Sequence, residues 1–126
     1  SILVAEDNLV NQKVVHGLLT KMGHSVVIVA QGDDAVAERI NPQSHFDIIL
    51  MDCEMPAMDG YEATRLIRAY ERDNGLPPIP IVALTAHALD EVRHKCLASG
   101  MNDFLTKPIN TTQLNRAIGH LFSPPA

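Results

Sequence analysis

The sequence predicts an α/β fold in which a parallel five-stranded sheet is covered by helices on both faces. Five short apolar runs alternate with five segments of helical pattern along the 126 residues. The apolar runs lack the polar alternation of a half-exposed sheet, so both faces of each strand should be buried. Consecutive parallel strands need a crossover connection, and each intervening helix supplies one, which should be right-handed.

The first half of the chain holds three strands and two helices. The strands are expected at residues 2–5, 26–30 and 46–51. Asn8 can cap the helix after the first strand. That helix should end near Met22, because Gly23 is a typical residue just past a helix end. The second helix begins at Gly32 and ends before Pro42, since proline disfavours a helical conformation in the residue that precedes it.

The second half continues the alternation. A turn at residues 55–60 contains proline and glycine, and a loop follows at 74–78. Gly100 should end the fourth helix. The domain is expected to span residues 1–122, with residues 123–126 as a linker remnant. The remaining strands are expected at 79–84 and 104–106, and the remaining helices at 61–72, 89–98 and 111–122.

Composition excludes several classes of function. Ten Lys and Arg stand against fifteen Asp and Glu, a net charge of −5, which argues against non-specific nucleic-acid binding. No apolar run approaches the roughly 20 residues of a membrane span, so we expect no membrane contact by this domain. Cys53 and Cys96 make no disulfide framework, which indicates a reducing compartment, and we expect the cytoplasm. The chain starts directly in an apolar run without methionine, and we expect an excised domain.

Polar residues of particular types follow four of the strands. Glu6 and Asp7 come after the first strand, Asp52 after the third, Thr85 after the fourth and Lys107 after the fifth. The carboxyl ends of parallel strands meet at one edge, where ligands bind in such folds. Crowded carboxylates repel one another, and a hard divalent cation such as Mg²⁺ would relieve the repulsion. A lysine and a hydroxyl nearby would complete a site for an oxyanion.

These motifs together resemble the receiver domains of two-component response regulators, over essentially the whole chain. The opening Glu6-Asp7-Asn8…Asn11 and the run 52–56 are most similar to receivers fused to hybrid sensor histidine kinases. The resemblance implies a flavodoxin-like sheet of strand order 2-1-3-4-5. The residues that carry it lie at 3–8, 47–52, 55–60, 81–86 and 107–108, reading LVAEDN, DIILMD, MPAMDG, IVALTA and KP.

The resemblance also implies the chemistry. Asp52 would accept a phosphoryl group from a phosphohistidine on a histidine kinase dimerisation domain or a histidine phosphotransfer protein. Asp7 and Asp52 would bind Mg²⁺, or Mn²⁺ in its place, while Glu6 would hold a coordinated water. The backbone carbonyl of Glu54 would be a further ligand. The domain would catalyse only its own phosphorylation and slow dephosphorylation.

Further residues take roles by the same resemblance. Lys107 would pair with one phosphoryl oxygen, and the Thr85 hydroxyl and the Ala86 amide would bind another. Phe104 would follow Thr85 inward when the domain switches. The bond before Pro108 would be cis.

Two features near this edge suggest further contacts. The resemblance implies that His87, two residues after Thr85, lies at the rim of the pocket, where it and Glu54 could tune how fast water reaches the phosphoryl group. A helical wheel of the first helix places Leu9 opposite the apolar arc, beside Lys13, and we expect both to dock the phosphodonor. The usual output face of the family is residues 88–122. The apolar arc consists of Val10, Val14, Val15, Leu18, Leu19 and Met22.

Three alternatives stay open at this point. The domain could be a stand-alone receiver that acts by binding a partner. If it is instead part of a hybrid kinase, the parent chain could be anchored in the inner membrane. A small hydrolase would use Asp52 as nucleophile and Glu54 as general acid and base. A flavodoxin-type cofactor binder would need a phosphate loop rich in Ser, Thr or Gly after the first strand, but residues 6–8 are anionic.

Overall fold

The computed structural model describes residues 1–87 and 89–122, and the expected linker remnant at 123–126 lies outside this part of the chain. Strands and helices alternate as the sequence predicts. The strands are β1 (Ile2–Ala5), β2 (Val26–Val29), β3 (Ile48–Asp52), β4 (Ile81–Thr85) and β5 (Asp103–Thr106). The helices are α1 (Leu9–Lys21), α2 (Gly32–Ile40), α3 (Gly60–Asp73), α4 (Asp90–Ser99) and α5 (Thr111–Phe122).

The five strands form one parallel sheet of order β2-β1-β3-β4-β5, so the predicted fold class is confirmed. Its register brings the carboxyl ends of the central strands close to the same level. Ala5 pairs with Met51 and Thr85 pairs with Thr106. The residues that follow β1, β3, β4 and β5 therefore share one edge.

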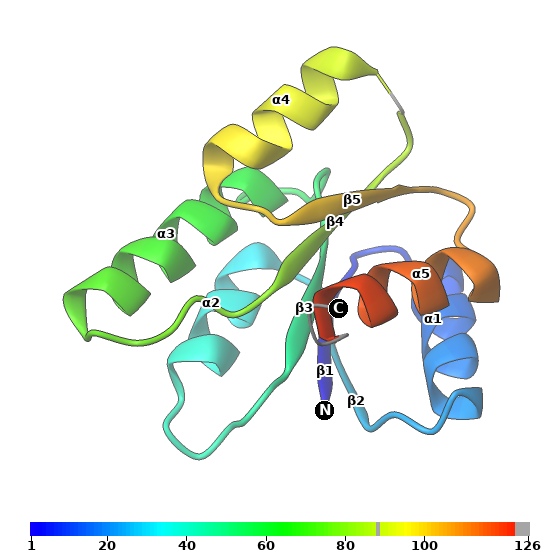
Figure 1. Ribbon diagram of the computed structural model, residues 1–126, viewed down its shortest axis with the longest axis horizontal. Coiled ribbons are helices and arrows are strands. Elements are labelled where there is room, and N and C mark those ends of the chain that lie inside the picture. The colour runs from blue at the N-terminus through cyan, green and yellow to red at the C-terminus, as the bar shows by residue number, and fades with distance from the viewer. Residues whose placement is uncertain (88, 123–126) are drawn as a thin grey trace.

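Helices lie on both faces of the sheet (Figure 1), and a hydrophobic core fills the space between each face and its helices. Successive strand residues alternate between the two cores, as in β3, where Ile49 and Met51 belong to one core and Ile48 and Leu50 to the other. Helices α2, α3 and α4 cover the first face, and α1 and α5 cover the second. Because both faces are covered, the central strands are continuously apolar.

The ends of the helices follow their local sequence signals. The Asn8 side chain accepts hydrogen bonds from the backbone N–H groups of Val10 and Asn11, which caps α1 as predicted. Helix α4 ends at Gly100, whose φ of 107° lies in the left-handed region. That conformation carries no steric penalty in glycine, which explains why the helix stops there.

Some element boundaries differ from the sequence-based expectation. Strand β4 begins at Ile81 rather than Ile79. Pro80 has no N–H to donate to a ladder, and the N–H of Ile79 donates instead to Glu71 Oε2 at 2.8 Å.

Strand β2 is an edge strand, and Val27 on it is 40% exposed. Among the described residues, no helix combines the length and apolar character needed to cross a bilayer.

Candidate functional site

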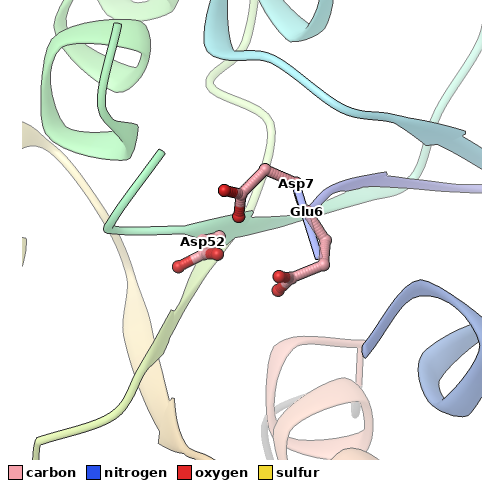
Figure 2. A group of neighbouring side chains, drawn as sticks. All are labelled: Glu6, Asp7 and Asp52. Atoms are coloured by element: carbon pink, nitrogen blue, oxygen red, sulfur yellow. The ribbon is translucent and has the colours of Figure 1, made fainter. Parts of the chain in front are cut away.

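Three carboxylates meet where β1 and β3 end. Glu6 and Asp7 follow β1, and Asp52 is the last residue of β3. Each contributes an oxygen to a group whose atoms all lie within 4.8 Å of one another (Figure 2). Glu6 and Asp52 are buried, whereas Asp7 is exposed. The strand register thus gathers the acids that the sequence places after separate strands.

Lys107 brings positive charge to this cluster from the end of β5. Its Nζ lies 3.0 Å from Glu6 Oε2 and 3.2 Å from Asp52 Oδ2. The backbone N–H of Lys107 donates to the carbonyl of Thr85 at 2.7 Å, which continues the β4–β5 pairing to the site. The Lys107–Pro108 peptide bond is cis.

The first turn of α1 surrounds Glu6. Glu6 Oε1 accepts hydrogen bonds from the Asn8 backbone N–H at 3.2 Å and from Asn11 Nδ2 at 3.4 Å. The Gln12 side-chain amide donates to the backbone carbonyl of Glu6 at 2.6 Å. Our sequence interpretation gave Asn11 and Gln12 no role at the site. Their signal is their place in the first helical turn after a strand that ends in an acid.

The electrostatics of the cluster are unbalanced. Burial raises the pKa of Asp52 from 3.8 to about 6, and the nearby Glu6 carboxylate adds to this, although the Glu54 backbone N–H and Lys107 oppose it. Burial lowers the pKa of Lys107, but the carboxylates of Glu6 and Asp52 raise it by more. The cluster therefore holds three acids and one ammonium group, which pairs with only Glu6 and Asp52, so an excess of negative charge remains.

These oxygens suit a hard divalent cation. Within the described part of the chain, Glu6 Oε2 is buried without a hydrogen-bond partner, since its contact with Lys107 is one of charge and not of hydrogen-bond geometry. Mg²⁺ is bound through one or two carboxylates together with water. Glu6, Asp7 and Asp52 could hold such an ion. The Glu54 side chain is not part of this group, and a role for its backbone carbonyl stays a prediction.

Thr85 and its neighbours lie at the same edge. The Thr85 side chain is buried, and its hydroxyl oxygen accepts from the His87 backbone N–H at 3.1 Å. Ala86 follows directly and is exposed. Phe104 is half-buried against the core of α2, α3 and α4, and it also lines a surface pocket of about 400 Å³ with Arg116 of α5.

Glu54 and His87 face each other at the rim. His87 Nε2 lies 3.8 Å from Glu54 Oε1, and both side chains are more than half exposed. The two residues come from the loops after β3 and β4, so their contact spans the opening between those strand ends.

The outer face of α1 is more apolar than the helical wheel predicts. Leu9 is 71% exposed and Lys13 is exposed, as expected for residues outside the arc. Two members of the expected arc, Val10 and Val14, are also exposed, so that part of the interpretation is wrong. The packed face of α1 is narrower than the arc, because only Val15 and Leu19 are fully buried beneath this helix. Leu9, Val10 and Val14 form what we call the α1 apolar surface.

The two thiols are structural. Cys53 and Cys96 are both buried, in the core shared by α2, α3 and α4. Burial raises the pKa of Cys53 to about 12, so this thiol stays protonated at neutral pH. A protonated, buried thiol is a poor nucleophile.

The doubly wound parallel sheet, with an acidic cluster and a lysine at its carboxyl edge, is the arrangement expected for a receiver domain. The model of the response regulator receiver domain matches residues 2–119, and the chain belongs to this family. Hybrid signal transduction histidine kinase I of Dictyostelium discoideum is 45% identical over 120 residues, which cover 93% of this chain and 7% of that kinase. The chain thus corresponds to a small part of this curated relative.

Two solved structures extend the comparison. The receiver domain of the sensor histidine kinase PA1611 from Pseudomonas aeruginosa PAO1, with a magnesium ion in its active-site cleft, is 43% identical with a TM-score of 0.79. The alignment covers 94% of this chain and 93% of that one. The receiver domain of Saccharomyces cerevisiae Ssk1, solved with the histidine phosphotransfer protein Ypd1, is 36% identical with a TM-score of 0.86. This alignment covers 94% of this chain and 85% of the Ssk1 chain.

Proposed function

We propose that this domain accepts a phosphoryl group on Asp52 from a phosphohistidine of a partner protein, as one step of a histidine-to-aspartate phosphorelay. The observation that carries the proposal is the position of the Asp52 carboxylate, which ends β3 between two other carboxylates and the ammonium of Lys107. No structural requirement of the sheet explains why these charges are gathered in one place.

The chemistry follows from nucleophilic attack. An oxygen of the Asp52 carboxylate forms a bond to phosphorus, the bond between phosphorus and the imidazole nitrogen breaks, and the electron pair of that bond returns to the imidazole. Phosphoryl transfer depends mainly on positioning and on neutralising charge. Lys107, whose Nζ lies 3.2 Å from Asp52, is proposed to neutralise one phosphoryl oxygen. The Thr85 hydroxyl and the Ala86 N–H are proposed to bind another.

The proposal includes a divalent cation at Glu6, Asp7 and Asp52. Mg²⁺, or Mn²⁺ in its place, would supply positive charge that offsets the three carboxylates and the incoming phosphoryl group. The PA1611 receiver domain holds magnesium in its cleft, which supports this part of the proposal.

Phosphorylation is proposed to switch the face formed by α4, β5 and α5. The Thr85 hydroxyl would leave its contact with His87 for the phosphoryl group, because an anion with several acceptor oxygens attracts donors. Phe104 would then turn inward from the surface pocket that it lines. Glu54 and His87 at the rim would set how readily water reaches the phosphoryl group.

The α1 apolar surface is the proposed docking place for the phosphodonor. Leu9 lies next to the acidic edge and presents a large exposed side chain, with Lys13 nearby to contact an acidic partner. A histidine phosphotransfer protein or a kinase dimerisation domain fits this role, and the Ssk1 receiver has been solved with such a phosphotransfer protein. The parent protein is proposed to be a hybrid histidine kinase, a proposal that the matched relative supports. We also propose that the domain lies in the cytoplasm.

The hydrolase alternative is not favoured by the structure. A general acid and base at Glu54 would have to reach the group bound to Asp52. The Glu54 side chain is instead 64% exposed and faces His87.

Incubation of the domain with acetyl phosphate and Mg²⁺ tests the proposal. We expect one acid-stable, base-labile phosphoryl adduct by mass spectrometry, which Asp52→Asn abolishes. Asp34→Asn, which changes an exposed acid of α2, is the control and should retain the adduct. An adduct that persists in Asp52→Asn, or continuous turnover of a phosphate ester, would overturn the proposal.

Docking is tested separately from chemistry. Leu9→Ala should slow phosphorylation by a phosphorylated histidine phosphotransfer protein while leaving phosphorylation by acetyl phosphate unchanged. Leu97→Ala, which changes an exposed leucine of α4, is the matched control and should alter neither reaction. Equal rates from the protein donor for Leu9→Ala and the unchanged domain would refute the docking role.

A further inference from the structure

Glu6 is the least solvent-accessible carboxylate of the acidic cluster, and its orientation depends on its neighbours. Its side chain is 1% exposed, so bulk solvent does not reach it. The two oxygens face different partners: Oε2 lies against Lys107, and Oε1 receives two donors from the first turn of α1. The direction of this carboxylate is therefore decided by Lys107 on one side and α1 on the other.

We infer that Asn11 is a positioning residue for the metal-binding edge, which holds the Glu6 carboxylate in place through its side-chain amide. The inference deepens the proposed function and rests on it, because it concerns how the same site binds its cation. Asn11 touches neither Asp7 nor Asp52 in the described hydrogen bonds, so any effect it has on the cation must pass through Glu6.

Geometry explains why one amide should matter. The Asn11 amide donates to Glu6 Oε1 at 3.4 Å and the Asn8 N–H donates at 3.2 Å, and both distances exceed the usual 2.9–3.0 Å. Such long bonds direct the carboxylate without holding it strongly. Losing one of two weak donors on the same oxygen leaves the other oxygen, and its attraction to Lys107, to decide the orientation.

There is also room for the carboxylate to move. A cavity of about 70 Å³ is bordered by Glu6, Asn11 and Lys107, with apolar groups on its other walls. This volume is enough for a side-chain rotation or for a bound water. Without the Asn11 amide, Glu6 could turn into this space and draw Lys107 with it, away from Asp52.

Gln12 complements this arrangement through the backbone. Its side-chain amide donates to the carbonyl of Glu6 at 2.6 Å, which ties the end of β1 to α1. Gln12 thus fixes the backbone from which the Glu6 side chain projects, and Asn11 fixes the carboxylate. Partners that orient metal ligands in this way commonly change metal affinity by 10–100-fold when removed.

Isothermal titration of the 126-residue chain with Mg²⁺ tests the inference directly. Asn11→Leu conserves the volume beside the cavity and removes the donor, and we expect its Mg²⁺ dissociation constant to rise about tenfold. Asn11→Gln keeps an amide and should recover most of the affinity. Asn115→Leu, the same change at an exposed position of α5, should leave the affinity unchanged.

A double-mutant cycle separates positioning from a general structural effect. In a Glu6→Gln background, Asn11→Leu should cause no further loss of Mg²⁺ affinity, since the carboxylate that it orients is gone. Asn11→Ala is carried through the same cycle in case the leucine variant does not fold. An equal loss in both backgrounds, or no loss when Asn11→Leu is made in the otherwise unchanged domain, would overturn the inference.

The outcomes also distinguish the inference from the proposed function. A domain that binds no Mg²⁺ and takes up no phosphoryl group fails the proposed function, and the inference falls with it. A domain that does both, but whose affinity is the same in Asn11→Leu, retains the proposed function and refutes the role of Asn11 alone.

Discussion

The Lys107 ammonium lies 3.2 Å from the Asp52 carboxylate, although the two residues are 55 positions apart in the chain. The same ammonium is 3.0 Å from Glu6, which is almost completely buried. One cation thus serves two acids at an edge that also carries Asp7. This sharing makes the site sensitive to changes in charge, and the predictions below use it.

Lys107→Met should destabilise the metal-free domain by about 3 kcal/mol, because it leaves Glu6 buried without a cation. The measurement is urea denaturation in EDTA. Adding Glu6→Gln to Lys107→Met should restore most of the loss, since the buried charge is then removed. If the double variant is no more stable than Lys107→Met, the buried charge of Glu6 is not the cause.

Asp52→Asn should stabilise the metal-free domain at neutral pH. The folded state raises the pKa of Asp52 from 3.8 to about 6, so it binds the proton more tightly than the unfolded state does. Stability therefore falls as pH rises from about 4 to 6, by about 2–3 kcal/mol in all, and Asp52→Asn avoids that loss. The difference in unfolding free energy between variant and unchanged domain should grow over this range in EDTA.

Mg²⁺ provides the control for that prediction. The cation should stabilise the unchanged domain more than Asp52→Asn, because the variant lacks one carboxylate of the cluster. A stability difference that does not vary between pH 4 and 7 in EDTA would contradict the raised pKa of Asp52.

Gly60→Ala should destabilise the domain by more than about 2 kcal/mol, since overpacking a tight site forces the backbone to shift. A Cβ atom at Gly60 would collide with the backbone carbonyl of Asp52. Thermal unfolding of Gly17→Ala gives the comparison, because nothing lies within 4 Å of a Cβ at Gly17. That variant should be more stable by roughly 0.5–1 kcal/mol, as expected for glycine replaced by alanine inside a helix. Equal effects of the two changes would refute the steric argument.

Glu71→Ala should cost about 3 kcal/mol of stability while leaving phosphorylation by acetyl phosphate intact. Glu71 is buried and accepts hydrogen bonds from Arg39, Arg68 and the Ile79 backbone N–H. Removing the carboxylate takes a hydrogen-bond acceptor away from each of these three donors. Glu71→Gln should lose less, because its carbonyl can still accept from Ile79. Urea denaturation measures both variants, and a loss in Glu71→Ala no larger than in Glu71→Gln would contradict this role.

Local sequence was sufficient to predict most elements of the fold. Apolar runs located the strands, and Asn8 and Gly100 located helix ends, because capping and left-handed conformations depend on single residues. The pattern of residues also indicated the edge with Glu6, Asp7 and Asp52, since the carboxyl ends of parallel strands must lie together. The resemblance to receivers supplied the strand order.

Local pattern was insufficient where packing between elements decides the outcome. The helical wheel assigned Val10 and Val14 to the apolar arc of α1, yet both are exposed, because a wheel gives the direction of a side chain and not what covers it. The three donors on Glu71 come from α2, α3 and the segment before β4, and no periodicity relates them.

The sequence by itself determined which chemical groups stand at the carboxyl edge, because each follows its own apolar strand. Only the tertiary structure decided how those groups share charge: Lys107 between Glu6 and Asp52, and Asn11 on the far oxygen of Glu6. The physical reason is that these contacts depend on distances of about 3 Å between elements that are remote in the chain. Such distances are set by the register of the sheet and the packing of α1 against it.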